Sequence, residues 1–237
     1  MDFWIYLVLF VAPLIGGLLA FYFKPKVEGK YKLLLSFSGA YLFSVAVLHF
    51  FPVIFSSGHI EHAGVYVLLG FFLQLLLEQL TRGLEHGHFH VHHDHHPSFV
   101  YTVMLGICIH SFFDGIPVFS GEHHGHNHSM LSAMALHKLP EGYALVVLLG
   151  LLNIKTSTSF ILLFLYSLVA PAGAMAASYF DNQNPHILMM MYALVGGLIL
   201  HVSTTIPFES ESGQHRFTYQ KIAAVGLGSL LAYLTSI

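Results

Sequence analysis

The sequence predicts an all-α integral membrane protein with eight transmembrane helices and with both termini outside the cytoplasm. Of its 237 residues, 55% are hydrophobic and only 9% are charged, which is too apolar for a soluble domain of this length. Apolar stretches of about 17 to 25 residues, the length that crosses a bilayer as a helix, recur along the whole chain. The basic residues fall in alternate gaps between these stretches, which sets the predicted topology.

Eight apolar stretches are the predicted spans, namely 3–23, 33–55, 64–80, 99–119, 131–150, 157–180, 187–206 and 218–236. The first continues to Phe23 with no basic segment before it, so it is a transmembrane helix rather than a cleaved signal peptide. The third is short and ends beside Glu78, which is expected to be solvated. The fourth carries Asp114, an acidic residue that is costly inside a bilayer.

Prolines lie in or beside several of these spans, at Pro13, Pro52, Pro117, Pro140, Pro171 and Pro207. A proline removes a backbone donor and frees the carbonyl four residues earlier. Pro140 would free the carbonyl of Leu136, so we expect a bent or unwound fifth span that lines a polar path. Pro13 and Pro52 are equally compatible with ordinary kinks.

Lysine and arginine orient the spans. Eight of the nine basic residues follow the first, third, fifth or seventh span: Lys24, Lys26, Lys30, Lys32, Arg82, Lys155, Arg216 and Lys221. Because cytoplasmic loops are enriched in these residues, both termini are predicted to lie outside the cytoplasm. The ninth, Lys138, lies inside the fifth span.

Residues 1–237 are expected to form a single transmembrane domain, because the gaps between spans are too short for a soluble domain. The expected location is the cell inner membrane. The longest gap, about 81–98, is predicted to be a histidine-rich cytoplasmic loop, and a second histidine cluster lies on the outer side. The loop histidines are His86, His88, His90, His92, His93, His95 and His96 in the first cluster and His123, His124, His126 and His128 in the second. Flexible imidazoles bind metal weakly, so both are candidate metal-binding tracts, although the outer cluster also fits a simple polar turn.

A six-residue pattern occurs twice within the spans. His110-Ser-Phe-Phe-Asp114-Gly lies in the fourth and His137-Lys-Leu-Pro-Glu141-Gly in the fifth. Each copy places an imidazole and a carboxylate four residues apart, on one face of a helix. A lone buried histidine is usually a packing residue, but two matched pairs on consecutive helices favour a shared metal site.

Two imidazoles and two carboxylates suit Zn²⁺ and tolerate Fe²⁺, Mn²⁺ and Cd²⁺, whereas Ca²⁺ and Mg²⁺ prefer oxygen ligands alone. Lys138 lies beside this set. With Asp114 and Glu141 it gives the empty site a charge of −1, which one divalent ion would change to +1 and a second to +3. Repulsion in a low-dielectric setting makes the second ion unfavourable, so the sequence predicts a mononuclear site. Asp114 could pair with Lys138 instead of binding metal, or Lys138 could turn away from the site.

The paired motifs resemble those on the fourth and fifth helices of the ZIP (Zrt/Irt-like) metal transporters, which read His-Asn-x-Pro-Glu-Gly and His-x-x-Pro-Glu-Gly. Two further elements are similar to family segments: His49-Phe-Phe-Pro52 to His-x-x-Pro, and Val169-Ala-Pro171-Ala-Gly173 to Glu-Pro-x-Gly. The eight spans, the outward termini and the histidine-rich cytoplasmic loop also match. The resemblance implies a divalent metal transporter with its metal site between helices four and five.

The departures from the family pattern concern the second metal of its two-metal centre. The four family positions that hold this ion correspond here to Ser111, Asp114, Lys138 and Ala170, and the last two cannot bind a cation. The resemblance therefore also implies a single site, held by His110, His137 and Glu141. Phe113 replaces the family's helix-four proline, so the fourth span is expected to bend at Pro117 instead.

Polar residues elsewhere in or near the spans are candidates for a pathway or relay, namely His49, Ser111, Lys138, His201 and Glu209. His49 and His201 are equally compatible with packing, and Glu209 with a solvated loop. The single cysteine, Cys108, excludes an intrachain disulfide.

The function expected from the sequence is transport of Zn²⁺, or of a related divalent cation, into the cytoplasm by alternating access around a midplane site. The expected partners are the metal ion and the lipid bilayer, with no nucleic acid, and a homodimer is compatible with the sequence. Two alternatives stay open. A cation-diffusion exporter also uses a His-x-x-x-Asp pair but has six spans, and an intramembrane zinc hydrolase would lack the usual His-Glu-x-x-His motif.

Overall fold

The computed structural model describes residues 3–23, 28–56, 58, 60–84, 97–119, 127–208 and 218–235, and no strand occurs within these ranges. The helices are α1 (Phe3–Tyr22), α2 (Glu28–Val45), the π-helical turn η1 (Ala46–Phe50), α3 (Phe51–Ser56), α4 (Ala63–Thr81), α5 (Pro97–Gly115), the 3-10 turn η3 (Ile116–Val118), α6 (Asn127–Leu151), α7 (Thr156–Ser167), α8 (Val169–Gln183), α9 (Pro185–Phe208) and α10 (Tyr219–Leu234). The predicted all-α fold is confirmed.

Seven segments of the described chain are long and apolar enough to cross a membrane, each within a few residues of a predicted span: Phe3–Tyr22, Tyr31–Ser56, Ala63–Thr81, Phe99–Val118, His128–Leu151, Thr156–Gln183 and Pro185–Ile206. The eighth predicted span corresponds to α10, which has 16 residues. At about 1.5 Å per residue it extends roughly 24 Å, short of the ~30 Å hydrocarbon core.

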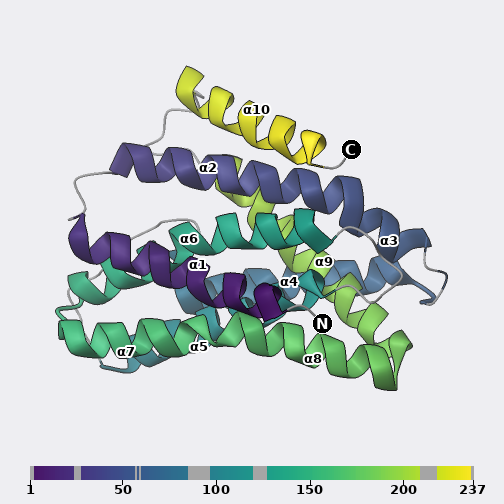
Figure 1. The fold of residues 1–237 in the computed structure, drawn as a ribbon, viewed down its shortest axis with the longest axis horizontal. Helices are drawn as coiled ribbons and strands as arrows, with labels where there is room; N and C mark the ends of the chain where they lie inside the picture. Colours follow the sequence, from purple (N-terminus) through teal and green to yellow (C-terminus); the bar gives the residue numbers. More distant parts are fainter. Residues whose placement is uncertain are drawn as a thin grey trace.

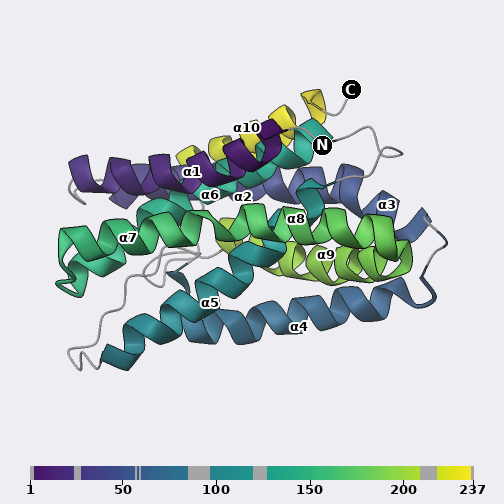
Figure 2. The same cartoon turned by 60° about the horizontal axis from the view of Figure 1, so that its bottom comes forward.

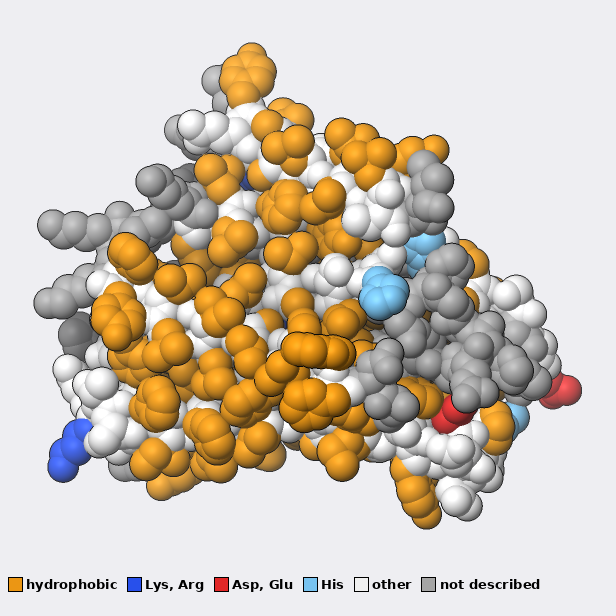
Figure 3. All heavy atoms as spheres, in the orientation of Figure 1, with side chains coloured by type: hydrophobic (Ala, Val, Ile, Leu, Met, Phe, Trp, Pro, Cys, Tyr) orange, Lys and Arg blue, Asp and Glu red, His pale blue; other side chains and the backbone are white. Residues whose placement is uncertain are grey.

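The helices run side by side along the long axis of the molecule (Figure 1). Helix α10 lies at one edge against α2, and α4 with α5 lies at the opposite edge (Figure 2). The two ends of the chain are at the same end of the bundle (Figure 1). Most of the surface visible in Figure 3 is apolar, and the charged side chains on it gather towards its ends, as a lipid-facing protein requires.

The prolines differ in their effect on the helices that contain them. The fifth span was expected to be bent or unwound at Pro140; helix α6 continues through this residue, so the unwound form is wrong. The Pro140 carbonyl accepts a hydrogen bond from the Tyr31 hydroxyl at 3.2 Å, within the buried interior. Pro117 lies in η3, where the fourth span changes from α-helix to a 3-10 turn. Just before Pro52, the Phe51 N–H donates to the Ala46 carbonyl five residues earlier, which forms the π-helical turn.

Glycines bring the two motif-bearing helices into backbone contact with neighbours. A Cβ atom on Gly142 of α6 would overlap the carbonyl of Pro13 in α1, and one on Gly16 of α1 would overlap the carbonyl of Leu139. Small residues at such crossings let membrane helices pack closely. The α6 helix is therefore fixed against α1 beside the second motif.

The first motif has an equivalent support. A Cβ on Gly115, next to Asp114, would overlap the carbonyl of Ala170 in α8, and one on Gly173 would overlap the carbonyl of Phe112. The α5 helix is therefore fixed against α8. Each pair of motif residues is carried by a helix that is packed through glycine onto a different partner.

Gly142→Ala is expected to destabilise the protein by about 1–3 kcal/mol, because the added methyl group must separate α1 from α6. Thermal unfolding in detergent measures this. Gly150→Ala is the matched control on α6, since a Cβ at Gly150 meets no atom within 4 Å among the described residues. Equal melting temperatures for the two variants would contradict the close packing of α1 and α6.

Candidate metal centre

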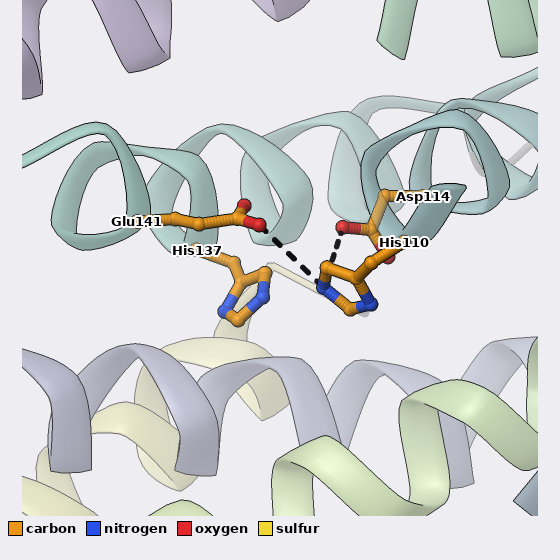
Figure 4. A group of neighbouring side chains, drawn as sticks. All are labelled: His110, Asp114, His137 and Glu141. Atoms are coloured by element: carbon orange, nitrogen blue, oxygen red, sulfur yellow. Dashed lines mark ion pairs between the residues drawn. The ribbon is translucent and has the colours of Figure 1, made fainter. Parts of the chain in front are cut away.

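Helices α5 and α6 bring the four motif residues together. Ligand-type atoms of His110, Asp114, His137 and Glu141 all lie within 4.8 Å of one another, and all four side chains are buried. Figure 4 shows the two carboxylates directed toward each other from the two helices, with both imidazoles on the same side of them. The four-residue spacing on each helix produces this convergence, because it places both side chains of a pair on one face.

His110 is tied to three polar neighbours. Its Nε2 atom lies 3.1 Å from Asp114 Oδ2 and 3.7 Å from Glu141 Oε1, contacts marked by dashed lines in Figure 4. Its Nδ1 atom lies 3.0 Å from Oε1 of Gln74, a buried residue of α4. Nε2 is thus the ring atom that faces the two carboxylates.

His137 is different, because neither of its ring nitrogens has a hydrogen-bond partner among the described residues. The side chain is 1% exposed, and its ring centroid lies 6.0 Å from that of His110. An imidazole buried without a partner is costly, and native structures rarely leave such groups unsatisfied. A metal ion at the centre of the four residues would satisfy it.

Lys138 points into the same group and is completely buried. Its Nζ atom lies 2.6 Å from Asp114 Oδ2 and 2.5 Å from Glu141 Oε2, and it donates a hydrogen bond to the Tyr166 hydroxyl oxygen at 3.3 Å. The alternative in which Lys138 turns away from the site is therefore wrong. Glu141 is shared, since Oε2 binds the ammonium while Oε1 faces His110.

The charges in this group do not cancel. Two carboxylates and one ammonium sum to −1 when the imidazoles are neutral. A net negative charge sealed from water attracts a cation strongly, because little solvent screens it. Imidazole nitrogen with carboxylate oxygen is also a donor set that suits zinc and its neighbours in the first row.

Two of the remaining candidate residues, His49 and His201, do not belong to the buried group of four. His201 Nε2 of α9 lies within hydrogen-bond distance of Glu78 Oε2 of α4, at 2.8 Å, so Glu78 is not simply solvated. Ser111 is buried next to His110, and His49 lies in η1 and is half-buried. His128, at the start of α6, is exposed. The other loop histidines and Glu209 lie outside the described residues.

Sequence reasoning missed Gln74 and Tyr166. Gln74 lies in the middle of the third predicted span, one turn before Glu78. A polar side chain within this apolar stretch was the signal that could have identified it as a functional candidate. Tyr166 lies near the end of α7 and is indistinguishable in the sequence from the other tyrosines of an aromatic-rich chain.

A family model described as "ZIP Zinc transporter" matches residues 90–235, which include both motifs and the four buried residues. Comparison with curated proteins gives no match.

Proposed function

The chain belongs to the ZIP zinc transporter family, and from this membership we propose that it carries Zn²⁺ into the cytoplasm by alternating access. Members of this family are transporters rather than enzymes, which removes the zinc hydrolase as an alternative. Membership also separates the chain from the cation-diffusion exporters. The seven apolar helical segments agree with an integral membrane location.

The observation that carries the proposal is the buried group of His110, Asp114, His137 and Glu141. We assign these residues as the ligands of the transported ion, with His137 the clearest case because its ring nitrogens have no other partner in the described chain. Zn²⁺ is the expected substrate, and Fe²⁺, Mn²⁺ and Cd²⁺ are compatible with the same donors.

The charge of Lys138 supports a single ion. One divalent cation changes the site from −1 to +1, and the ammonium occupies one oxygen of each carboxylate. A second cation would face both the first ion and the ammonium in a low-dielectric interior. The proposed site is therefore mononuclear.

Burial of the ligands supports alternating access. The four residues are at most 2% exposed, so an ion cannot reach or leave them without movement of the surrounding helices. Alternating access supplies such a movement by opening a midplane site first to one side and then to the other. His201 and Glu78, paired near the end of α4 that precedes the histidine-rich loop, are the proposed relay toward the cytoplasm.

The proposed topology has eight spans across the cell inner membrane. Helix α10 is the last span, and both termini lie outside the cytoplasm. The charge pattern of the loops supports it. So does the position of both chain ends at one end of the bundle (Figure 1).

Zinc uptake by vesicles tests the proposal. Purified protein in liposomes that enclose a zinc-sensitive dye is expected to admit external Zn²⁺, and His110→Ala plus Glu141→Ala is expected to reduce uptake to the leak of protein-free vesicles. The matched control is His186→Ala plus Glu61→Ala, which removes an exposed histidine and an exposed glutamate. Uptake by the site variant at the wild-type rate would refute the ligand assignment. Zinc flux in intact cells then gives the direction.

A further inference from the structure

We propose that Gln74 is a positioning residue that holds His110 in one tautomer, with the proton on Nδ1 and the lone pair of Nε2 directed at the metal. This rests on the proposed function, since it concerns how one ligand of that site is oriented. Gln74 belongs to α4, a helix that contributes none of the four assigned ligands.

The geometry of the contact determines the tautomer. Gln74 Oε1 lies 3.0 Å from His110 Nδ1, and an amide oxygen can only accept a hydrogen bond. Nδ1 must therefore carry the proton. A neutral imidazole that binds metal has one N–H, so Nε2 is left with its lone pair, and a cation would take the place of a proton between Nε2 and the carboxylate oxygens. Nε2 is also the atom nearest the two carboxylates, at 3.1 Å from Asp114 Oδ2 and 3.7 Å from Glu141 Oε1.

The position of Gln74 argues against a role in packing alone. It is completely buried, while its neighbours Leu75 and Leu76 are exposed on the outer face of α4. A polar amide inside a membrane helix is unfavourable unless a hydrogen bond to a partner compensates for its burial. The amide Nε2 group of Gln74 has no hydrogen-bond partner among the described residues. Within that part of the chain, the hydrogen bond of the Gln74 side chain is therefore the one between its Oε1 atom and His110 Nδ1.

Helix α4 is a rigid support for this contact. One turn before Gln74, a Cβ on Gly70 would overlap the carbonyl of Leu194 in α9, and one on Gly197 would overlap the carbonyl of Val67. The amide is thus presented by a helix fixed to α9, while the imidazole is carried by α5. Outer partners of this kind orient metal-binding histidines, and their loss typically lowers metal affinity by about 10–100-fold.

The two histidines of the site are consequently unequal. His110 has an oriented ring, whereas His137 has no such partner in the described chain. The inference assigns Nε2 as the metal-binding atom of His110.

Two substitutions separate positioning from packing. Gln74→Met keeps the length of the side chain and replaces the amide oxygen by a thioether sulfur, which is only a weak acceptor, whereas Gln74→Glu keeps an acceptor oxygen. Zinc affinity is measured by competition with a coloured chelator, on purified protein whose two loop histidine clusters are replaced. Gln74→Met is expected to bind zinc about 10–100-fold more weakly. Gln74→Glu is expected to bind at least as tightly as wild type, and Gln79→Met, an exposed position on α4, is the control.

Nitrogen NMR of the labelled imidazoles gives a readout that a purely structural role would not move. The His110 signals are identified by their loss in His110→Ala, and the zinc-bound wild type is expected to show the proton on Nδ1 and zinc on Nε2. A proton on Nε2 in wild type would overturn the inference, even if Gln74→Met fails to fold.

The affinity measurements have distinct outcomes. Wild-type affinity in Gln74→Met, or an equal loss in Gln74→Met and Gln74→Glu, would overturn the inference and leave the metal site standing. If His110→Ala binds as much zinc as wild type does, the intramembrane metal site, and with it the proposed function, fails instead.

Discussion

Replacement of His137 by alanine is expected to eliminate zinc binding at the intramembrane site and to leave the metal-free protein about as stable as wild type. Loss of a ligand should weaken binding by more than the roughly 10–100-fold that loss of an outer partner costs. Stability should change little, because the lost imidazole has no hydrogen bond in the described structure, and removal of an unsatisfied buried group offsets the cavity that it leaves.

Melting temperature in detergent, measured with and without zinc, separates these two effects. A ligand that binds only the folded state raises the melting temperature, so zinc should stabilise wild type and not His137→Ala. His186→Ala removes an exposed histidine and should behave as wild type. Zinc stabilisation of His137→Ala equal to that of wild type would exclude His137 as a ligand.

Lys138→Asp is expected to change the metal stoichiometry from one ion per chain to two. The substitution makes the empty site −3 instead of −1, since Asp114 and Glu141 are joined by a third carboxylate. Two divalent ions then give +1, the same charge that one ion gives in wild type. The metal-free variant should be strongly destabilised, because three buried carboxylates would lack the ammonium that now bridges two of them.

Elemental analysis of purified protein without the loop histidine clusters measures the stoichiometry. Lys155→Asp is the control, since Lys155 is exposed in the loop before α7. Two ions in the unsubstituted protein would refute the role assigned to Lys138, and so would a single ion in Lys138→Asp.

The helical spans could be predicted closely from the sequence because their length and apolarity are dictated by the bilayer. The sixth span shows the limit of that signal. It was predicted as one stretch, 157–180, but the chain divides at Leu168 into α7 and α8. Pro171 has no N–H to donate to the Ser167 carbonyl, which accounts for a break that hydropathy does not detect.

The convergence of the two motifs could also be anticipated, since each histidine and carboxylate pair lies on one helical face. The orientation of Lys138 could not. A lysine can extend in several directions from a helix, and its direction here depends on Tyr166 from α7 and on both carboxylates. The partner of Gln74 was equally out of reach, because a single amide in an apolar run can be noticed but has no spacing pattern that links it to a residue 36 positions away.

The enclosure of Lys138 bears on how the protein responds to its ionic surroundings. Dissolved salt weakens interactions between charges that face water, over a Debye length of about 8 Å at physiological strength. The ammonium and its two carboxylates are at most 3% exposed, so mobile ions cannot enter among them. The lysine thus acts as a counter-ion to the carboxylates that is fixed by covalent bonds. While the site is enclosed in this way, the chain itself sets the electrostatic environment of the metal, independently of the salinity on either side of the membrane.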